Sequence, residues 1–259
     1  MLIDYTMPMK SLFLFFILLL SFTAQANSSC IENRSENGVI HISKINLNCP
    51  HLEMITTLPK DQGLTVSEFA EKYQTNVAIN GSFFRKDLSP LGLNISQFKK
   101  WQKSNDTLAR SFLACTANNR CHIDPINRIT SAKPNWKLAL AGWHYYSEKS
   151  GKFECSTRDK IGCSQDIFTG KHPRTMIGLD EKHNWLYLVV VEGRQLTYRG
   201  MTMDELAQLA TQLNLTYALN LDGGGSSTMV IDNKRISALP LLQGSERKVA
   251  NHFGVRLQR

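Results

Sequence analysis

The stretch Tyr217–Ile231, YALNLDGGGSSTMVI, decides the architecture that we predict for this 259-residue chain. Its first five residues are apolar apart from Asn220 and predict a buried strand, and Thr228–Ile231 predicts a second strand. Between them stand one aspartate, three glycines and two serines. Glycine loses more backbone entropy on folding than any other residue, so three in succession indicate a turn where the backbone approaches another group closely.

The turn Asp222–Ser227 also carries the most chemistry in the sequence. The N–H groups of its glycines, together with its two hydroxyls, can form a nest for a phosphate or sugar oxygen. Asp222, at the end of the strand, is well placed for acid–base or nucleophilic work. The alternative is a β-bulge or tight corner whose serines only cap the backbone. The turn lacks the lysine of a nucleotide P-loop and the spacing of a G-x-S-x-G serine-hydrolase elbow.

The residues before this stretch predict a hairpin and a helix. Thr175–Leu179 and Trp185–Val191 are apolar runs separated by a polar turn, which is typical of a β-hairpin. The second run is continuously apolar from Leu186, as expected for a strand covered on both faces. Thr202-x-x-Glu205 is a capping box, and the leucines and alanines after it recur at helical spacing.

The rest of the chain completes a prediction of the fold class. Residues 86–170 are the least regular part and hold four of the six cysteines, so we interpret them as an insertion. The sequence predicts an α+β fold, a mixed β-sheet flanked by helices, in a single domain over residues 27–259 with a disulfide-containing insertion. The other elements that we expect are strands at Val39–Leu47, Val77–Ile79 and Lys137–Gly142, a helix at Thr65–Gln74 and a disulfide-held loop at Cys155–Gly170.

Several polar residues stand at the ends of predicted strands. Glu192 and Arg194 project to the same face if their strand continues, and the alternative is an ion pair at the hairpin end. Arg174 enters the same hairpin and can offer a bidentate fork to a phosphate, with an ordinary surface arginine as the alternative. Asn80 offers both a donor and an acceptor to a ligand, although taken alone it indicates a turn.

Residues 1–26 predict a cleavable secretory signal. Lys10 supplies a positive charge, Ser11–Phe22 is an uncharged apolar run, and Ala24-Gln25-Ala26 has the small-x-small pattern of a signal peptidase site. The run is shorter than the ~20 residues that span a bilayer, so an uncleaved anchor is the weaker alternative. No second long apolar segment follows in the sequence. We therefore expect a secreted or periplasmic protein with no integral membrane segment after cleavage of the signal.

The six cysteines all follow the predicted signal, and an even number in an exported chain favours disulfides. Cys115–Cys121 and Cys155–Cys163 are candidate local loop closures, although the sequence cannot choose among the possible pairings. Structural zinc is not favoured, because no C-x-x-C pair occurs and the spacings are irregular. His122-Ile123-Asp124 has a metal-like spacing but stands alone, so we predict no metal site and no cofactor.

The formal net charge of +8 does not indicate binding to nucleic acid. Lysines and arginines are scattered, and the densest cluster, Lys99, Lys100 and Lys103 around Trp101, is small. A nucleic-acid partner is not expected, because a longer basic stripe or a known motif would then be present. A solvated basic surface with some attraction to anionic envelope polymers is the better interpretation.

Several short motifs follow one another along the chain. They are Asn80-Gly81 before two phenylalanines, Pro173-Arg174-Thr175 with Ile177-Gly178, Glu192-Gly193-Arg194, Gly200-Met201-Thr202, Asn220–Ser227 and Glu246–Asn251. Together they resemble the phosphodiester glycosidase family, most strongly over residues 172–258. Two residues depart from the usual pattern of that family: Ser82 stands where a second glycine is usual, and Glu192 stands where aspartate is usual. Because its carboxylate lies one methylene further out, Glu192 is the second choice for the catalytic group and Asp222 is the first.

The resemblance implies an exported hydrolase that cleaves sugar-1-phosphodiesters, of the N-acetylglucosamine-1-phosphodiester type, at the anomeric carbon–oxygen bond. Its partner would be a glycan or envelope polymer, and Asp222 and Glu192 would be catalytic. Whether the configuration is retained or inverted depends on the separation of the two carboxylates. The alternatives are a metal-dependent phosphodiesterase, which needs a His/Asp ligand cluster, and a non-catalytic domain that binds an envelope polymer or glycan. The residues expected to bind the substrate are Asn80, Gly81, Arg174, Thr175, Arg194, Gly223, Gly224, Gly225, Ser226 and Ser227.

Overall fold

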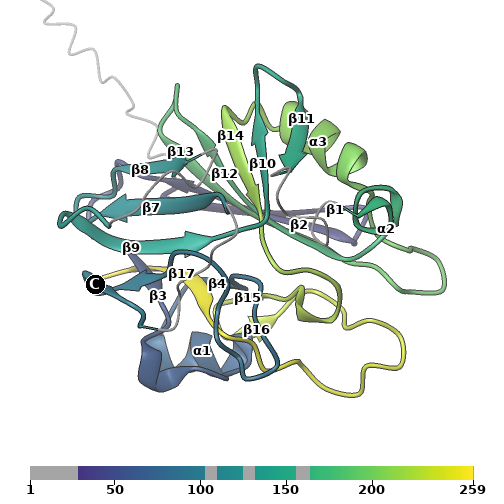
Figure 1. The fold of residues 1–259 in the computed structure, drawn as a ribbon, viewed down its shortest axis with the longest axis horizontal. Coiled ribbons are helices and arrows are strands. Elements are labelled where there is room, and N and C mark those ends of the chain that lie inside the picture. The colour runs from purple at the N-terminus through teal and green to yellow at the C-terminus, as the bar shows by residue number, and fades with distance from the viewer. Residues whose placement is uncertain (1–28, 103–109, 125–131, 156–163, 259) are drawn as a thin grey trace, which may run out of the picture.

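The computed structural model describes residues 29–102, 110–124, 132–155 and 164–258. Within these ranges the strands form three sheets (Figure 1). The first sheet has the order β1 (Ile31–Glu36), β2 (Ile40–Asn46), β13 (Trp185–Val191), β12 (Arg174–Asp180), β14 (Tyr217–Asn220), β10 (His144–Ser147) and β11 (Lys152–Cys155). The second has the order β16 (Lys234–Arg235), β15 (Met229–Ile231), β4 (Val77–Asn80), β17 (His252–Leu257) and β3 (Leu52–Thr56). The third has the order β6 (Lys99–Lys100), β5 (Ile95–Ser96), β9 (Trp136–Ala141), β7 (Phe112–Thr116) and β8 (Cys121–Asp124).

Every strand pairing between the described residues is antiparallel, so the prediction of a mixed sheet was wrong. The helix α3 (Met203–Gln212) does connect two strands that run in the same direction, β13 and β14. However, β12 lies between them and pairs antiparallel with both. A helical crossover therefore occurs without any parallel ladder, which the order of elements along the sequence cannot reveal.

The hydrophobic core lies where the three sheets face one another. Along β13, Leu186, Leu188 and Val190 point into this shared core, while Tyr187, Val189 and Val191 point to the opposite face. The second sheet contributes Met54, Ile79 and Phe253 to the shared core, and the third contributes Leu113, Leu138 and Leu140. This alternation confirms that β13 is covered on both faces, as its unbroken apolar run predicted.

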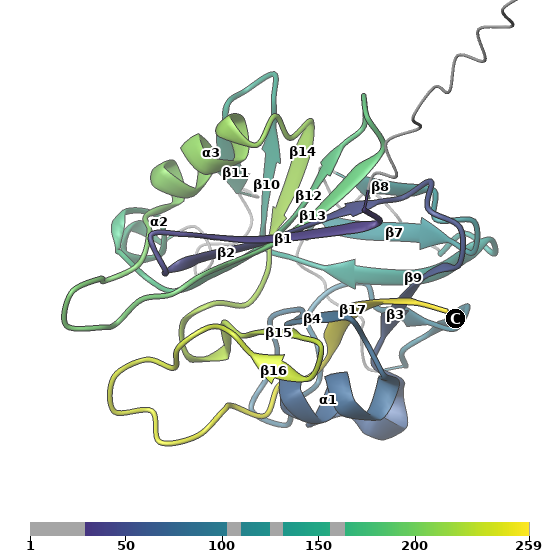
Figure 2. The same cartoon turned by 180° about the vertical axis from the view of Figure 1, so that it is seen from behind.

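The helices cover the outer faces of the sheets, rather than flanking one sheet on both sides (Figures 1 and 2). Leu206, Leu209 and Ala210 of α3 pack against the first sheet. The helix α1 (Val66–Tyr73) packs Phe69 and Ala70 against the second. Both helices begin at predicted positions: Thr65 and Thr202 each accept a hydrogen bond from the N–H group of a glutamate three residues later, and that glutamate returns a bond. The remaining short helices are η1 (Pro59–Asp61), α2 (Gln165–Thr169) and η2 (Gly224–Ser226).

The irregular segment 86–170 supplies all five strands of the third sheet and adds β10 and β11 to the edge of the first. Its predicted disulfide Cys115–Cys121 is confirmed and closes the β7–β8 hairpin. The expected loop from Cys155 to Gly170 is partly wrong, because α2 lies within it. Cys163, the expected partner of Cys155, lies outside the described residues.

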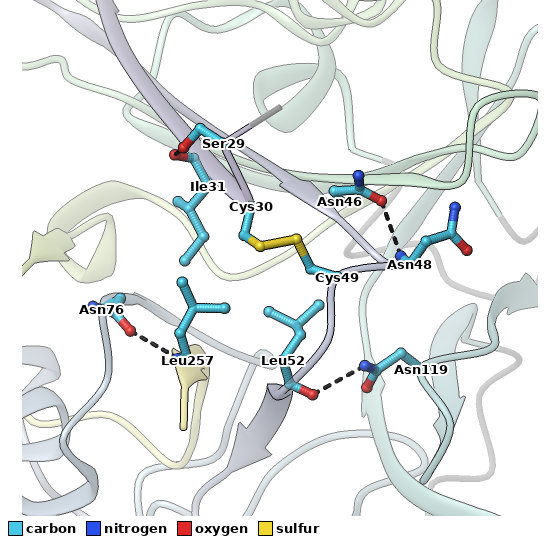
Figure 3. The surroundings of a disulfide bond; sticks show 10 residues. All are labelled: Ser29, Cys30, Ile31, Asn46, Asn48, Cys49, Leu52, Asn76, Asn119 and Leu257. Carbon is cyan, nitrogen blue, oxygen red and sulfur yellow. Dashed lines mark hydrogen bonds between the residues drawn. A yellow bond between two sulfur atoms is a disulfide. The ribbon is translucent and has the colours of Figure 1, made fainter. Parts of the chain in front are cut away.

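A second disulfide, Cys30–Cys49, was not predicted as a pair. It joins the residue before β1 to the loop before β3, with a Cα–Cα distance of 5.6 Å (Figure 3). The bridge therefore ties an edge of the first sheet to an edge of the second. Two disulfides agree with the expectation of an oxidising environment. The predicted signal at residues 1–26 lies outside the described residues, and no described helix is long and apolar enough to cross a bilayer.

Candidate active site

The turn 222–227 lies where strand ends of the first and second sheets meet, and Asn80 joins them. The Nδ2 of Asn80 donates to the backbone oxygen of Asp222 at 2.6 Å. Its Oδ1 accepts from the hydroxyl of Thr175 at 2.8 Å and from the backbone N–H of Thr228 at 3.2 Å. Three segments distant in the sequence therefore converge on one buried amide. Asn80 and Thr175 were expected to contact substrate, but these bonds make them part of the frame that positions Asp222.

The carboxylate of Asp222 stands in a mostly dry environment. The residue is only partly exposed, and burial raises the pKa of its carboxyl group to about 6 from an ordinary value of 3.8. A hydrogen bond with Ser226, the charge of Arg247 and the N–H group of Gly223 each lower that pKa, but together they do not outweigh burial. A carboxyl group that titrates near neutral pH beside two bond donors can act as a base or a nucleophile.

The three glycines mainly provide space for neighbouring side chains, and two of their N–H groups are bonded within the protein. The N–H of Gly224 donates to the backbone oxygen of Pro173 at 2.9 Å, and that of Gly223 is bonded to the Asp222 carboxylate. The predicted nest, in which the N–H groups of all three glycines face a substrate, is therefore not formed. A Cβ at Gly224 would lie 3.1 Å from a guanidinium nitrogen of Arg194, and one at Gly225 would lie 2.8 Å from a nitrogen of Arg247. The glycine run lets two arginines lie directly against the backbone.

Arg194 and Arg247 therefore lie against adjacent residues of the turn, and both are exposed. One interpretation of the sequence placed Arg194 on a continuation of its strand, but β13 ends at Val191. Arg194 has a left-handed φ of 56°. Arg247 was not among the predicted site residues. In the sequence, its one indication of a role was that it belongs to the motif at residues 246–251. In the structure its Nη1 lies 3.4 Å from the hydroxyl of Ser226. Two solvent-accessible guanidinium groups beside a carboxylate form a suitable cradle for an anionic group.

Arg174 has a different position from the one that its phosphate-binding prediction needs. Its side chain is buried, and it donates to three backbone oxygens, those of Met201 at 2.9 Å, Ile167 at 2.7 Å and Gly170 at 3.0 Å. Burial lowers the pKa of its guanidinium to about 10. Arg174 thus joins the end of α2 to the start of α3, and Arg194 and Arg247 are the guanidinium groups available at the turn.

Glu192 is buried and bound within the protein. Its Oε1 lies 2.8 Å from Nε2 of His41 and accepts from the backbone N–H of Ala238 at 2.6 Å. The other ring nitrogen of His41 lies 2.8 Å from the hydroxyl of Ser35. Glu192 therefore links strand β2 to the loop that carries Arg247. A catalytic role for this residue, as the sequence suggested, has to use its second oxygen.

The remaining predicted residues lie around the same turn. Gly81 approaches Asn251 so closely that a Cβ would overlap its side chain and backbone, and its N–H donates to the Asn251 oxygen at 2.9 Å. Ser82, the departure from the family pattern, donates through its hydroxyl to Oδ1 of Asn94 at 3.0 Å, so that the serine is satisfied in a buried position. The hydroxyl of Ser227 is buried without a hydrogen-bond partner among the described residues. Among the residues that the structure describes, no group of three His, Cys, Asp or Glu side chains could hold a metal ion.

Solved structures of other proteins share this fold. One is the catalytic domain of zebrafish N-acetylglucosamine-1-phosphodiester alpha-N-acetylglucosaminidase, auto-inhibited by its pro-peptide, with a TM-score of 0.67 and 21% identity over 90% of this chain and 85% of that chain. Another is a putative exported protein from Burkholderia pseudomallei, with a TM-score of 0.61 and 15% identity over 84% of this chain and 73% of that one. This chain thus shares its fold with the catalytic domain of the zebrafish enzyme.

The sequence comparison is more specific. The sequence model of the phosphodiester glycosidase family matches residues 73–256, and the chain belongs to that family. The mouse N-acetylglucosamine-1-phosphodiester alpha-N-acetylglucosaminidase is 26% identical over 183 residues, which are 65% of this chain and 34% of the mouse protein. A prophage-derived uncharacterized protein of Bacillus subtilis is 26% identical over 195 residues, or 72% of this chain and 29% of that protein. The chain therefore matches about a third of the length of these relatives.

Proposed function

We propose that this protein is an exported hydrolase that cleaves sugar-1-phosphodiesters, of the N-acetylglucosamine-1-phosphodiester type, between the anomeric carbon and the bridging oxygen. The observation that carries the proposal is the placement of Asp222, a carboxyl group with a raised pKa, on a glycine turn against which Arg194 and Arg247 lie. Membership of the phosphodiester glycosidase family supports the same substrate class.

In this proposal the two arginines bind the phosphate. As the bond to the anomeric carbon breaks, both of its electrons leave with the bridging oxygen, and negative charge grows on the phosphate. Arg194 and Arg247 stabilise that charge, because each carries a fixed positive charge and several donors in a plane. A phosphate is already a good leaving group, so strong protonation by a general acid is not required.

Asp222 acts at the anomeric carbon. Its ionised carboxylate either attacks the carbon directly, to give a glycosyl-enzyme that water hydrolyses, or removes a proton from a water molecule that attacks. Ser226 and Gly223 hold the carboxylate through hydrogen bonds. We keep Glu192 as the second catalytic candidate, acting through the oxygen that neither His41 nor Ala238 engages in the bonds described above.

The residues around the turn have two kinds of role in this proposal. Arg194, Arg247, Ser226 and Ser227 contact the substrate. The hydroxyl of Ser227, which has no hydrogen-bond partner among the described residues, bonds a sugar or phosphate oxygen in this proposal. Most of the others position Asp222 and the two arginines through the bonds and close contacts described above; these are Asn80, Gly81, Thr175, Gly223, Gly224 and Gly225. Arg174 instead holds the end of α2 to the segment before α3.

Hydrolysis in oxygen-18 water tests which bond breaks. A synthetic N-acetylglucosamine-1-phosphodiester serves as the substrate, and both products are analysed by mass spectrometry. Attack at the anomeric carbon places the label on the free sugar, whereas attack at phosphorus places it on the phosphate. Label found only in the phosphate would replace the proposal with a phosphodiesterase mechanism. Tight binding of the substrate without any turnover would support the non-catalytic alternative.

A further inference from the structure

Two loops beside the candidate active site expose large apolar side chains. We call residues 193–201 and 236–251 the rim loops. The described residues include four exposed large hydrophobic side chains, and three of them, Leu196, Leu241 and Leu242, lie on the rim loops. Leu196 is 88% exposed and Leu242 is 97% exposed, so neither side chain packs against the protein. The fourth, Phe98, lies between β5 and β6 of the third sheet.

Hydrogen bonds hold the rim loops together and against the catalytic turn. The N–H of Leu241 donates to the backbone oxygen of Arg194 at 3.0 Å, and the side-chain amide of Gln195 donates to the backbone oxygen of Leu239. The side chain of Gln243 donates to the backbone oxygen of Gly225 at 2.9 Å. In both ribbon views the loops project from the same end of the molecule (Figures 1 and 2). The exposed leucines therefore have fixed places beside the site.

The backbone of Leu242 gives independent support for a role of its side chain. Its φ is 68°, in the left-handed region that glycine and asparagine adopt far more readily than leucine. Because the side chain is almost wholly exposed, no packing within the protein offsets this strain. Residues held in such conformations cluster at functional positions.

The rim loops are also positively charged. Arg199 and Lys248 are exposed on them, in addition to the two arginines of the site. In these loops, all of whose residues the structure describes, Glu246 is the one carboxylate. Its two oxygens accept bonds from the backbone N–H and the hydroxyl of Ser67, at 2.9 and 2.7 Å. Single leucines that protrude between exposed cations are typical of a surface that enters the headgroup region of an anionic membrane.

We propose that the rim loops dock on an anionic lipid membrane, with Leu196, Leu241 and Leu242 inserted below the headgroups and Arg199 and Lys248 on the lipid phosphates. Docking in this way turns the catalytic turn toward the membrane surface. If the proposed function holds, the natural substrate is then a sugar phosphodiester displayed on that membrane. Binding to the membrane itself requires no turnover, so it can be tested separately.

Vesicle co-sedimentation with the purified chain tests the proposal. The vesicles contain either equal parts of phosphatidylglycerol and phosphatidylcholine or phosphatidylcholine alone. We expect binding to the anionic vesicles that weakens with added salt, and a loss of about tenfold or more in partitioning for the double variant Leu196→Ser/Leu242→Ser. Phe98→Ser, which removes an exposed apolar side chain elsewhere, should bind as the unaltered protein does.

Turnover of a small soluble phosphodiester provides the second measurement. The double variant should hydrolyse it at the unaltered rate, because neither leucine belongs to the proposed catalytic machinery. Failure of the unaltered protein to bind anionic vesicles at low salt would overturn the membrane proposal, as would equal binding by the double variant. A matching loss of turnover on the soluble substrate would also overturn it, since the leucines would then hold substrate rather than lipid. None of these results depends on which bond the enzyme cleaves.

Discussion

The substitution Asp222→Asn should remove activity and also make the protein more stable at neutral pH. Asparagine keeps the size of the side chain and one acceptor oxygen for the bonds to Ser226 and Gly223, but it carries no charge. The activity is lost because neither a nucleophile nor a base remains at this position. The gain in stability follows from the burial that raises the pKa of this group to about 6.

The size and the pH dependence of that gain can be worked out from the raised pKa. A rise from 3.8 to about 6 corresponds to about 3 kcal/mol of penalty for the ionised carboxylate in the folded state. Between these two pH values the folded protein holds more protons than the unfolded chain, so its free energy of unfolding falls as the pH rises. The penalty is absent below about pH 4 and complete above about pH 6. Since Asp222 keeps some contact with solvent, we expect about 1–3 kcal/mol at pH 8.

Thermal unfolding of both proteins from pH 4 to pH 8 measures the effect. For a protein of this size, each kcal/mol corresponds to about 2–4 °C in Tm, so the variant should melt several degrees higher at pH 8 and at the same temperature at pH 4. In the unaltered enzyme, kcat/KM should rise with pH through a pKa near 6. A variant that is less stable at every pH would refute the argument that the carboxylate is buried at a cost. Near-normal turnover would move the chemistry to another residue, with Glu192 the first to test.

Three further predictions concern the surroundings of Asp222. Arg247→Gln should raise KM about 10- to 100-fold, because it removes a charged donor to the phosphate. It should also shift the acidic limb of the pH–rate profile to higher pH, because the charge of Arg247 lowers the pKa of Asp222. Steady-state kinetics of the control variant, Lys248→Gln at the neighbouring residue, should be little changed. Gly225→Ala should lower kcat/KM about tenfold, because its methyl group would displace the side chains of Gln243 and Arg247. Gly244→Ala, where a methyl group meets open space, is the matched control, and equal effects would contradict the packing argument. Selective reduction of the disulfide that closes the β7–β8 hairpin should lower the free energy of unfolding by about 2 kcal/mol in a denaturant titration, and an unchanged midpoint would show that the hairpin is held by other contacts.

Local patterns in the sequence predicted two of the helices and several of the strands well. Trp185–Val191 was predicted with the bounds that β13 has, and the predicted capping box at Thr202 marks the start of α3. These features depend on neighbouring residues: a run of apolar side chains, or a threonine followed by a glutamate three residues later. The alternation of side chains between the two faces of β13 follows directly from the geometry of a strand.

Apart from short elements such as α2, the main features that the sequence did not predict depend on distant pairings. Outside the local hairpins, the direction of each strand relative to its neighbour is set by packing between segments far apart in the chain, and so is the Cys30–Cys49 bridge between two sheets. The same holds for the arginines. Arg174 follows a proline at the entrance of a strand, as a substrate-binding residue could, but the carbonyls around it are set by α2 and the start of α3. Arg247 lies in an irregular loop, where no periodic pattern indicates which group a side chain will meet.

The hydrogen bonds of Asn80 and Asn251 determine how early in its synthesis and folding this protein can become active. The site exists only after Asn80 has met Thr228, 148 residues later, and after Ser82 has met Asn251, 169 residues later. Residues 252–257 are also the strand β17 that pairs with both β3 and β4. A nascent chain from which Asn251 has not yet emerged therefore has no assembled active site, however much of its first sheet has formed. Contacts of such long range also form slowly, so the appearance of activity should be among the last events of folding.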